Sequence, residues 1–194
     1  GTEHVLVDYE PRQPVTTMDE ALASSATPVH DELQHNTFLD LTPFPDDEID
    51  EVFDRSVVVR TSTTSARQNA LPIEPRGCVA EWVDRDEQLV VHISTQVPHQ
   101  VRTAIARSLG LAERNIRVVV PDVGGGFGLK CVVGREEIAV AAAAVRLRRP
   151  IKWIEDRRDG LIASVHGRQQ HYDVRAAFDE DGQPWLAWGS YWGG

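Results

Sequence analysis

Four glycines surround one aromatic residue in the run Asp122-Val123-Gly124-Gly125-Gly126-Phe127-Gly128-Leu129-Lys130, shortly after a stretch of β-branched residues. Glycine has no Cβ, so the backbone N–H groups of such a run can approach an anion or a planar ring, and positive φ angles cost little. Two phosphate-binding motifs do not fit. A Walker loop needs lysine where Leu129 stands, and G-x-G-x-x-G needs glycine there. The run predicts a cofactor-binding loop, or else a tight structural turn.

The composition permits an enzyme without pointing to one. The 194 residues can bury a sizeable core, and the formal charge of −10 argues against nucleic acid or an anionic membrane as a partner, because clustered Lys and Arg bind both. No stretch approaches the ~18 apolar residues of a membrane span. Cys78 and Cys131 are the only cysteines, which predicts a reduced, cytoplasmic protein in which both are small buried residues.

Two strands, residues 79–83 and 89–93, are predicted to form a hairpin around a polar turn at residues 84–87. The hairpin delivers Ser94-Thr95-Gln96 at its end. A helix then begins, with Pro98 in its first position and Gly110 at its end. Taken alone, Gln96 is most simply a side chain that satisfies nearby backbone groups.

The glycine run lies between a predicted buried strand, residues 116–120, and a predicted helix, residues 136–147. This position suits an anion held by backbone amides near a helix start. Another strand follows at residues 151–154. The charged residues 155–159 are expected to be a solvated or salt-bridged loop that enters a helix near Asp159. Together these elements predict an α+β fold with a mixed β-sheet and packed helices.

The two ends of the chain give weaker patterns. Residues 5–10 predict a strand that Pro11 ends, and a short helix should follow at 17–23. Residues 46–54 predict an amphipathic helix with Asp46 as its N-cap, whose acidic face is solvated rather than a metal site. A strand at 55–60 should extend through 61–65, and residues 172–178 should form a hairpin with 185–188. The spacing of His166 and His171 does not favour a zinc pair.

Three sequence blocks resemble the molybdenum hydroxylases, the family of xanthine dehydrogenase, aldehyde oxidase and carbon monoxide dehydrogenase. They are Glu74-Pro75-Arg76-Gly77 followed by Val79-Ala80-Glu81-Trp82, then Ser94-Thr95-Gln96, then Gly124-Gly125-Gly126-Phe127-Gly128. Their order, spacing and residue types agree with the molybdopterin-binding subunit. The resemblance covers residues 69–159 and is far more specific than a lone glycine loop.

The resemblance implies roles for five residues. Gln96 would be a hydrogen-bond partner of an oxygen ligand of the metal, and Gly125, Gly126, Phe127 and Gly128 would contact molybdopterin. No residue of this chain is assigned as a metal ligand. The cofactor would contain molybdenum, in the cytosine dinucleotide form, and would belong to the complete enzyme. We expect Gln96 and Phe127 to converge on one side of a cleft, with the glycine backbone exposed or bordering it.

The resemblance also implies an organisation. Residues 1–30 would be the tail of a preceding α/β hammerhead domain, 31–54 a linker with the short acidic helix, and 55–194 the N-terminal part of the molybdopterin-binding domain. The glutamate that acts as general base in the family would lie in a missing remainder of the large subunit. We therefore expect the chain alone to be catalytically silent and to associate with itself or with that remainder.

The same resemblance implies partner subunits. A [2Fe–2S] cluster takes four thiolates, so two cysteines cannot hold one, and electrons would leave through iron–sulfur and flavin subunits. Leu129 replaces a common family glycine, and Cys131 replaces a substrate-contacting glutamate of xanthine-type enzymes. Purine specificity is thus unsupported, and an aldehyde-oxidising or carbon monoxide dehydrogenase-like relative fits better. The resemblance implies an enzyme that oxidises an aldehyde, heterocycle or carbon monoxide-like substrate with water as the oxygen source.

Two other classes of function remain open from the sequence. The chain could be a non-catalytic fragment or subunit-interface module with the same fold. A nucleotide-binding domain that uses the glycine loop is weaker, because neither phosphate motif is intact.

Overall fold

The computed structural model describes residues 4–23, 25–37, 39, 41 and 47–193. The chain forms two compact units, one made of Gly1–Ser65 with Gln170–Gly194 and the other of Ala66–Gln169. The second unit contains all three sequence blocks that carry the resemblance.

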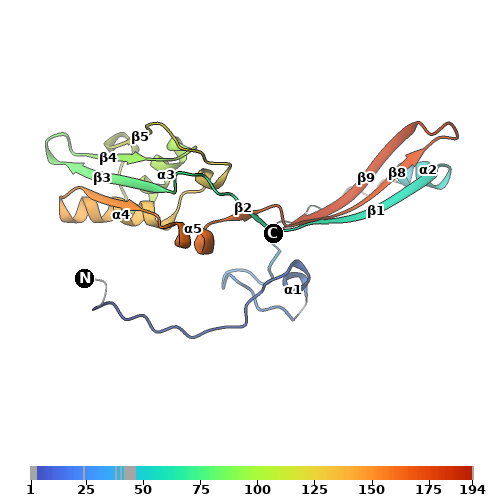
Figure 1. The fold of residues 1–194 in the computed structure, drawn as a ribbon, viewed down its shortest axis with the longest axis horizontal. Coiled ribbons are helices and arrows are strands. Elements are labelled where there is room, and N and C mark those ends of the chain that lie inside the picture. The colour runs from blue at the N-terminus through green and yellow to red at the C-terminus, as the bar shows by residue number, and fades with distance from the viewer. Residues whose placement is uncertain (1–3, 24, 38, 40, 42–46, 194) are drawn as a thin grey trace. The chain divides into compact units, whose positions relative to one another are not determined.

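A four-stranded mixed sheet forms the frame of the 66–169 unit, with strand order β5-β4-β3-β6 (Figure 1). The predicted hairpin is confirmed as β3 (Gly77–Val83) and β4 (Gln88–Ile93), which pair antiparallel around a 3-10 turn at Asp84–Asp86. β5 (Ile116–Val119) pairs parallel with β4, and β6 (Ile151–Ile154) pairs antiparallel with β3. The parallel pair needs a crossover, which α3 provides.

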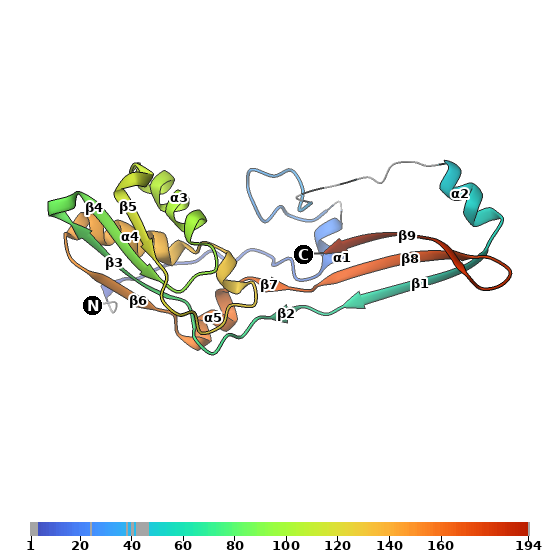
Figure 2. The same ribbon diagram turned by 90° about the horizontal axis from the view of Figure 1, so that it is seen from above.

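Two helices cover one face of this sheet (Figure 2). α3 (Pro98–Leu109) begins with Pro98, and Gly110 ends it in the left-handed conformation, as predicted. α4 (Arg135–Leu147) packs beside it. Alternate strand residues and the apolar stripes of both helices share one core. Its fully buried members are Ala80, Leu89, Val91, Ile105, Ala141 and Ala144.

The rest of this unit consists of short elements. The 3-10 turn Leu129–Cys131 follows the glycine run, and α4 then begins at Arg135, which confirms the helix predicted at residues 136–147. α5 (Arg157–Ala163) has Asp156 as its N-cap, and the Asp156 carboxylate accepts a hydrogen bond from Arg158 N. β2 (Gln68–Asn69) pairs with β7 (His166–Gly167).

The other unit contains an antiparallel three-stranded sheet in the order β1-β8-β9. The predicted strand of residues 55–65 appears as β1 (Val57–Ser65), and the predicted hairpin as β8 (Gln170–Phe178) and β9 (Pro184–Gly193). The acidic helix is α2 (Asp47–Asp54), which packs on β8. Arg175 contacts the buried Phe53 ring from 4.1 Å and pairs with Asp50. The expected N-cap, Asp46, lies outside the described residues.

The N-terminal strand prediction is wrong. Residues 5–10 are exposed and pair with no other strand among the described residues, so their backbone groups have no ladder to join. The helix predicted next to them does form, as α1 (Met18–Leu22), because Thr17 and Glu20 build a local capping box. The hammerhead, linker and molybdopterin-binding boundaries expected at residues 30 and 54 stay predictions.

Candidate functional site

The glycine run of residues 124–128, here called the glycine loop, has two kinds of glycine. Gly125 and Gly128 have φ angles of +94° and +87°, which L side chains rarely adopt. Gly124 and Gly126 lack room for a side chain: a Cβ on Gly124 would lie 2.5 Å from Glu74 Cβ, and one on Gly126 would lie 2.6 Å from Gln96 Cδ. The loop therefore needs glycine for backbone freedom at two positions and for close approach at two others.

Phe127 is the exposed aromatic residue of the loop. Its φ angle is +50°, an uncommon value for a bulky residue, and 77% of its surface is accessible. The hydrogen bond from Leu129 N to Gly126 O (2.9 Å) closes a tight turn that contains Phe127, and that from Cys131 N to Gly128 O (3.1 Å) closes the next turn. The chain thus presents an aromatic ring outward from a hydrogen-bonded loop.

Gln96 lies against this loop, where β4 gives way to α3. Gln96 Oε1 accepts a hydrogen bond from Gly128 N at 3.1 Å, and Gln96 N donates to Lys130 O at 3.0 Å. Thr95, which is buried, also donates to Lys130 O, at 3.1 Å. The crossover from β4 through α3 to β5 brings the end of β4 back to the loop. The structure therefore brings Gln96 and the glycine loop together, as the sequence predicted.

The glycine backbone is only partly open. Gly128 and Phe127 are exposed, whereas Gly126 is buried beneath the Gln96 side chain. The expectation that the whole of residues 125–128 is exposed or borders a cleft is therefore wrong at Gly126. A hollow of about 470 Å³ in the same unit lies elsewhere, with Pro98 and Val118 among its lining residues. The site is marked by its hydrogen-bond donors rather than by that hollow.

Glu74 connects the start and the end of the glycine loop. Its Oε2 accepts hydrogen bonds from Gly124 N (2.7 Å), Lys130 Nζ (2.7 Å) and Ser94 Oγ (2.6 Å). Lys130 Nζ also donates to Ser94 Oγ at 2.8 Å. The hydrogen bond from Lys130, then that from Ser94, lowers the pKa of Glu74 to about 2. Glu74 is therefore a carboxylate throughout the physiological pH range.

A second set of contacts supports the segment that carries Glu74. Arg157 Nη2 donates to the carbonyl oxygens of Pro72 (2.6 Å) and Ile73 (2.9 Å). A Cβ on Gly125 would lie 3.3 Å from Pro72 Cβ, so this segment also lines the loop. The predicted charged loop at residues 155–159 is thus salt-bridged and hydrogen-bonded, and one of its arginines fixes the neighbouring backbone.

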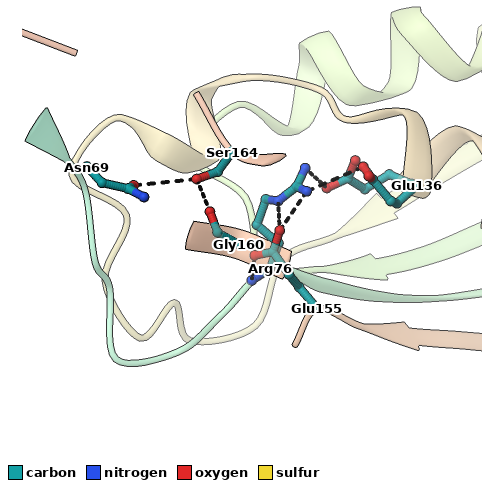
Figure 3. A network of polar contacts seen from close by, with 7 residues as sticks. Asn69, Arg76, Glu136, Glu155, Gly160 and Ser164 are labelled. Atoms are coloured by element: carbon teal, nitrogen blue, oxygen red, sulfur yellow. Dashed lines mark hydrogen bonds and ion pairs between the residues drawn. The ribbon is translucent and has the colours of Figure 1, made fainter. Parts of the chain in front are cut away.

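Arg76 is the centre of a buried ionic cluster (Figure 3). It contacts Glu155 through Nε (3.0 Å) and Nη2 (2.8 Å), Glu136 at 3.4 Å and Glu137 at 3.6 Å. Its guanidinium also lies 5.3 Å from the centre of the Trp153 ring. A Cβ on Gly134 would displace the ends of the Arg76 and Glu137 side chains, so the entry to α4 lies against the cluster.

Burial governs the titration of two groups beside Arg76. It raises the pKa of Glu137, whose Oε2 has no hydrogen-bond partner among the described residues. It also raises the pKa of the Cys78 thiol to about 12, so Cys78 is an unreactive core residue. Cys131, by contrast, is exposed, because the turn after the glycine loop places it on the surface. The expectation that both cysteines are buried is wrong for Cys131.

Sequence reasoning missed the roles of Glu74, Lys130 and Arg76. Glu74 and Arg76 stood in a block that served only to identify the family, and Lys130 was only the last residue of the run. For Lys130 the sequence did contain a signal, since it is one of only two lysines in the chain. No pattern in the sequence shows that the Lys130 side chain is completely buried.

The donors around the glycine loop fit a pterin cofactor. Because Gln96 Oε1 accepts from Gly128 N, the Nε2 donors of Gln96 remain for another acceptor, and they have no partner within the described part of the chain. The exposed Phe127 ring and the exposed Gly128 backbone lie beside them. The same described residues contain no group of three or more His, Cys, Asp or Glu suited to a metal ion. No helix among them is long and apolar enough to cross a membrane.

Comparisons with known proteins identify the family of the chain. Residues 29–185 match the molybdopterin cofactor-binding domain family. The chain is 36% identical over 137 residues to the nicotine 6-hydroxylase large subunit of Paenarthrobacter nicotinovorans, covering 70% of this chain and 17% of that protein. It is 30% identical over 194 residues to the carbon monoxide dehydrogenase large chain of Afipia carboxidovorans, covering 93% and 24%.

A solved structure extends the likeness to the fold. Quinoline 2-oxidoreductase from Pseudomonas putida 86 superposes with a TM-score of 0.86 at 35% identity, over 96% of this chain and 24% of that one. The chain therefore spans about a quarter or less of these relatives. With its mixed sheet, its glycine loop and the family match, the chain belongs to the molybdopterin-binding domains of the molybdenum hydroxylases.

Proposed function

We propose that this chain forms part of the cofactor site of a molybdenum hydroxylase, which oxidises an aldehyde, a heterocycle or a carbon monoxide-like substrate with water as the oxygen source. The observation that carries the proposal is the contact between Gln96 Oε1 and Gly128 N at 3.1 Å. It fixes the side-chain amide beside the loop and leaves its N–H donors for a ligand. The names of the relatives, which include a nicotine hydroxylase and a carbon monoxide dehydrogenase, support this range of substrates.

In this proposal the residues of the chain bind and orient. The backbone of Gly125, Gly126 and Gly128, with the Phe127 ring, contacts molybdopterin, and Gln96 donates a hydrogen bond from Nε2 to an oxygen ligand of the metal. The bound molybdenum cofactor supplies the redox chemistry. Donors held in place before the ligand arrives contribute more than donors that must first be ordered. Cys131 stands where xanthine-type enzymes have a substrate-contacting glutamate, so purine specificity is unsupported.

We further propose the cytosine dinucleotide form of the cofactor, a cytoplasmic location, and assembly with iron–sulfur and flavin subunits. The relatives that are named as a large subunit or a large chain support a multi-subunit enzyme. The two cysteines of this chain are fewer than the four thiolates of a [2Fe–2S] cluster, which supports a cluster carried elsewhere. The remainder of the large subunit would complete the site, and self-association of the chain remains part of the proposal.

The test compares two substitutions in the complete protein. Gln96→Ala should retain molybdenum while dye-linked turnover falls about 100-fold, because an orienting donor is lost. Gly126→Val should lose both, since its side chain would displace Gln96. Gln100→Ala, an exposed glutamine on α3, and Gly167→Val, where a Cβ meets nothing within 4 Å, are the matched controls.

The outcomes separate the proposal from its alternative. Molybdenum in the wild-type protein, measured by elemental analysis, together with turnover that Gln96→Ala removes, supports the enzyme. A complete protein without molybdenum and without turnover would instead favour a non-catalytic module with the same fold. Equal turnover in Gln96→Ala and Gln100→Ala would remove Gln96 from the site.

A further inference from the structure

We propose that Glu74 and Lys130 form an ionic latch that sets the conformation of the glycine loop, so that both are positioning residues for the backbone that faces the ligand. The latch consists of Glu74, Lys130 and Ser94. It concerns the shape of the loop itself. Only its link to cofactor binding rests on the function proposed above.

The first argument is connectivity. Glu74 binds Gly124 at two points, because Glu74 N donates to Gly124 O (3.2 Å) and Gly124 N donates to Glu74 Oε2 (2.7 Å). Lys130 also acts at two points: its Nζ donates to Glu74 Oε2, and its carbonyl accepts from Gln96 N. The ion pair therefore links Gly124, through Glu74, to Lys130, which follows the loop in the chain. Gln96 is held by the same lysine.

The second argument is burial. The Lys130 side chain is completely buried, whereas that of Glu74 is 39% exposed. A buried ammonium group needs a charged partner, since removing that partner leaves an uncompensated charge. Lys130 Nζ finds Glu74 Oε2 and Ser94 Oγ, both of which belong to segments that flank the loop. The need to neutralise the lysine thus draws these segments together under the loop.

The third argument is steric. A Cβ on Gly124 would lie 2.5 Å from Glu74 Cβ, and one on Gly126 would lie 2.6 Å from Gln96 Cδ. Two glycines of one loop are therefore packed against two side chains, and Lys130 bonds to the Glu74 carboxylate and to the backbone of Gln96. A shift of Glu74 would move Gly124, and a shift of the Lys130 carbonyl would move Gln96. The latch thus controls both sides of the surface that carries Phe127 and Gly128.

The test is a pair of substitutions measured by amide hydrogen exchange in the complete protein, prepared without molybdenum. The double variant Glu74→Gln/Lys130→Met removes both charges and leaves no buried unpaired ion. Exchange in a peptide covering residues 121–131 should accelerate about tenfold, because the Gly124 N–H loses its carboxylate acceptor. Peptides from β4 and α4 should keep their wild-type rates.

The control pair is Arg102→Met/Glu113→Gln, which removes an exposed ion pair of the same unit with an N–O distance of 3.1 Å. It should leave exchange in the loop unchanged. Glu74→Gln alone should accelerate exchange in the β4 and α4 peptides more than Lys130→Met alone does. Adding Lys130→Met to Glu74→Gln should return exchange in these peptides to the wild-type rate. That rescue identifies the unpaired lysine as the cause of the loss.

Each result decides a question. Unchanged exchange in the loop of the double variant, or equal acceleration in the core, would overturn the latch. Molybdenum content, measured on parallel samples prepared with molybdate, separates the latch from the proposed function. A wild-type protein without molybdenum whose loop still opens in the double variant would keep the latch and reject the function.

Discussion

Lys130 and Arg76 are both buried cations of the 66–169 unit, but the balance of donors and acceptors around them differs. At Lys130, three donors converge on one carboxylate oxygen of Glu74. At Arg76, one guanidinium faces three carboxylates, and Glu137 Oε2 has no partner among the described residues. The pKa of Glu74 is accordingly lowered to about 2, mainly by the hydrogen bond from Lys130, whereas burial raises that of Glu137.

This difference separates two tasks. The donor-rich group holds a loop backbone, because the ionised Glu74 accepts a charge-assisted hydrogen bond from Gly124 N. The acceptor-rich group joins larger elements, namely the start of β3, the start of α4 and the end of β6. The comparison predicts that the first group affects the site and that the second affects stability.

The largest expected effect is that of Arg76→Met on stability. The substitution leaves the buried Glu155 and Glu137 carboxylates without a counter-charge, which should lower the free energy of unfolding by about 3–5 kcal/mol. Denaturant unfolding followed by tryptophan fluorescence measures it, with Trp153 beside the guanidinium as a local reporter. Arg102→Met, which breaks an exposed pair, should cost less than about 1 kcal/mol. Similar losses in both variants would contradict the special role of Arg76.

A smaller effect is expected from the titration of Glu74. Because its pKa is lowered from 4.5 to about 2, its contribution to stability is present above about pH 4.5 and is lost as pH falls towards 2. Since Glu74 is partly exposed, we expect about 1–2 kcal/mol in total. The stability difference between wild type and Glu74→Gln should therefore shrink between pH 5 and pH 2. A constant difference across that range would argue against an ionised latch.

The smallest effect on stability is expected from Glu137→Gln, and unlike the two changes above it should not lower the free energy of unfolding at pH 7. With a raised pKa, Glu137 favours the folded state in its neutral form, and this contribution is lost as pH rises through the folded-state value. Glutamine stays neutral, so at pH 7 the variant should be as stable as wild type or more stable, by about 1 kcal/mol or less. At pH 4 the gain should disappear. A clear loss at pH 7 would mean that Arg76 needs this charge.

The sequence predicts the elements of the 66–169 unit well, because their signals are local. Pro98 and Gly110 bound α3, and the polar turn after Val83 sets the hairpin. Gln96 reaches the glycine loop because a strand, a helix and a parallel strand return the chain to the same edge of the sheet. The family resemblance supplied the pairing that the residues alone left open.

Other features could not be predicted, because they depend on contacts far apart in the chain. Glu74 and Lys130 are 56 positions apart in the sequence. Nothing in the sequence around them shows that the Lys130 side chain is buried while that of Glu74 is partly exposed. The strand expected at residues 5–10 has the right residue types but no neighbour among the described strands. Cys131 is exposed because of a turn that follows from the backbone angles of Gly128.

The left-handed conformation of Phe127 has a consequence for the thermodynamics of association. A bulky residue at φ +50° carries about 1–3 kcal/mol of backbone strain, and this strain is already present in the folded chain. The loop backbone is therefore ordered before a partner molecule binds, so binding loses little further conformational entropy. The preformed conformation of the loop should therefore favour binding at the exposed Phe127 ring.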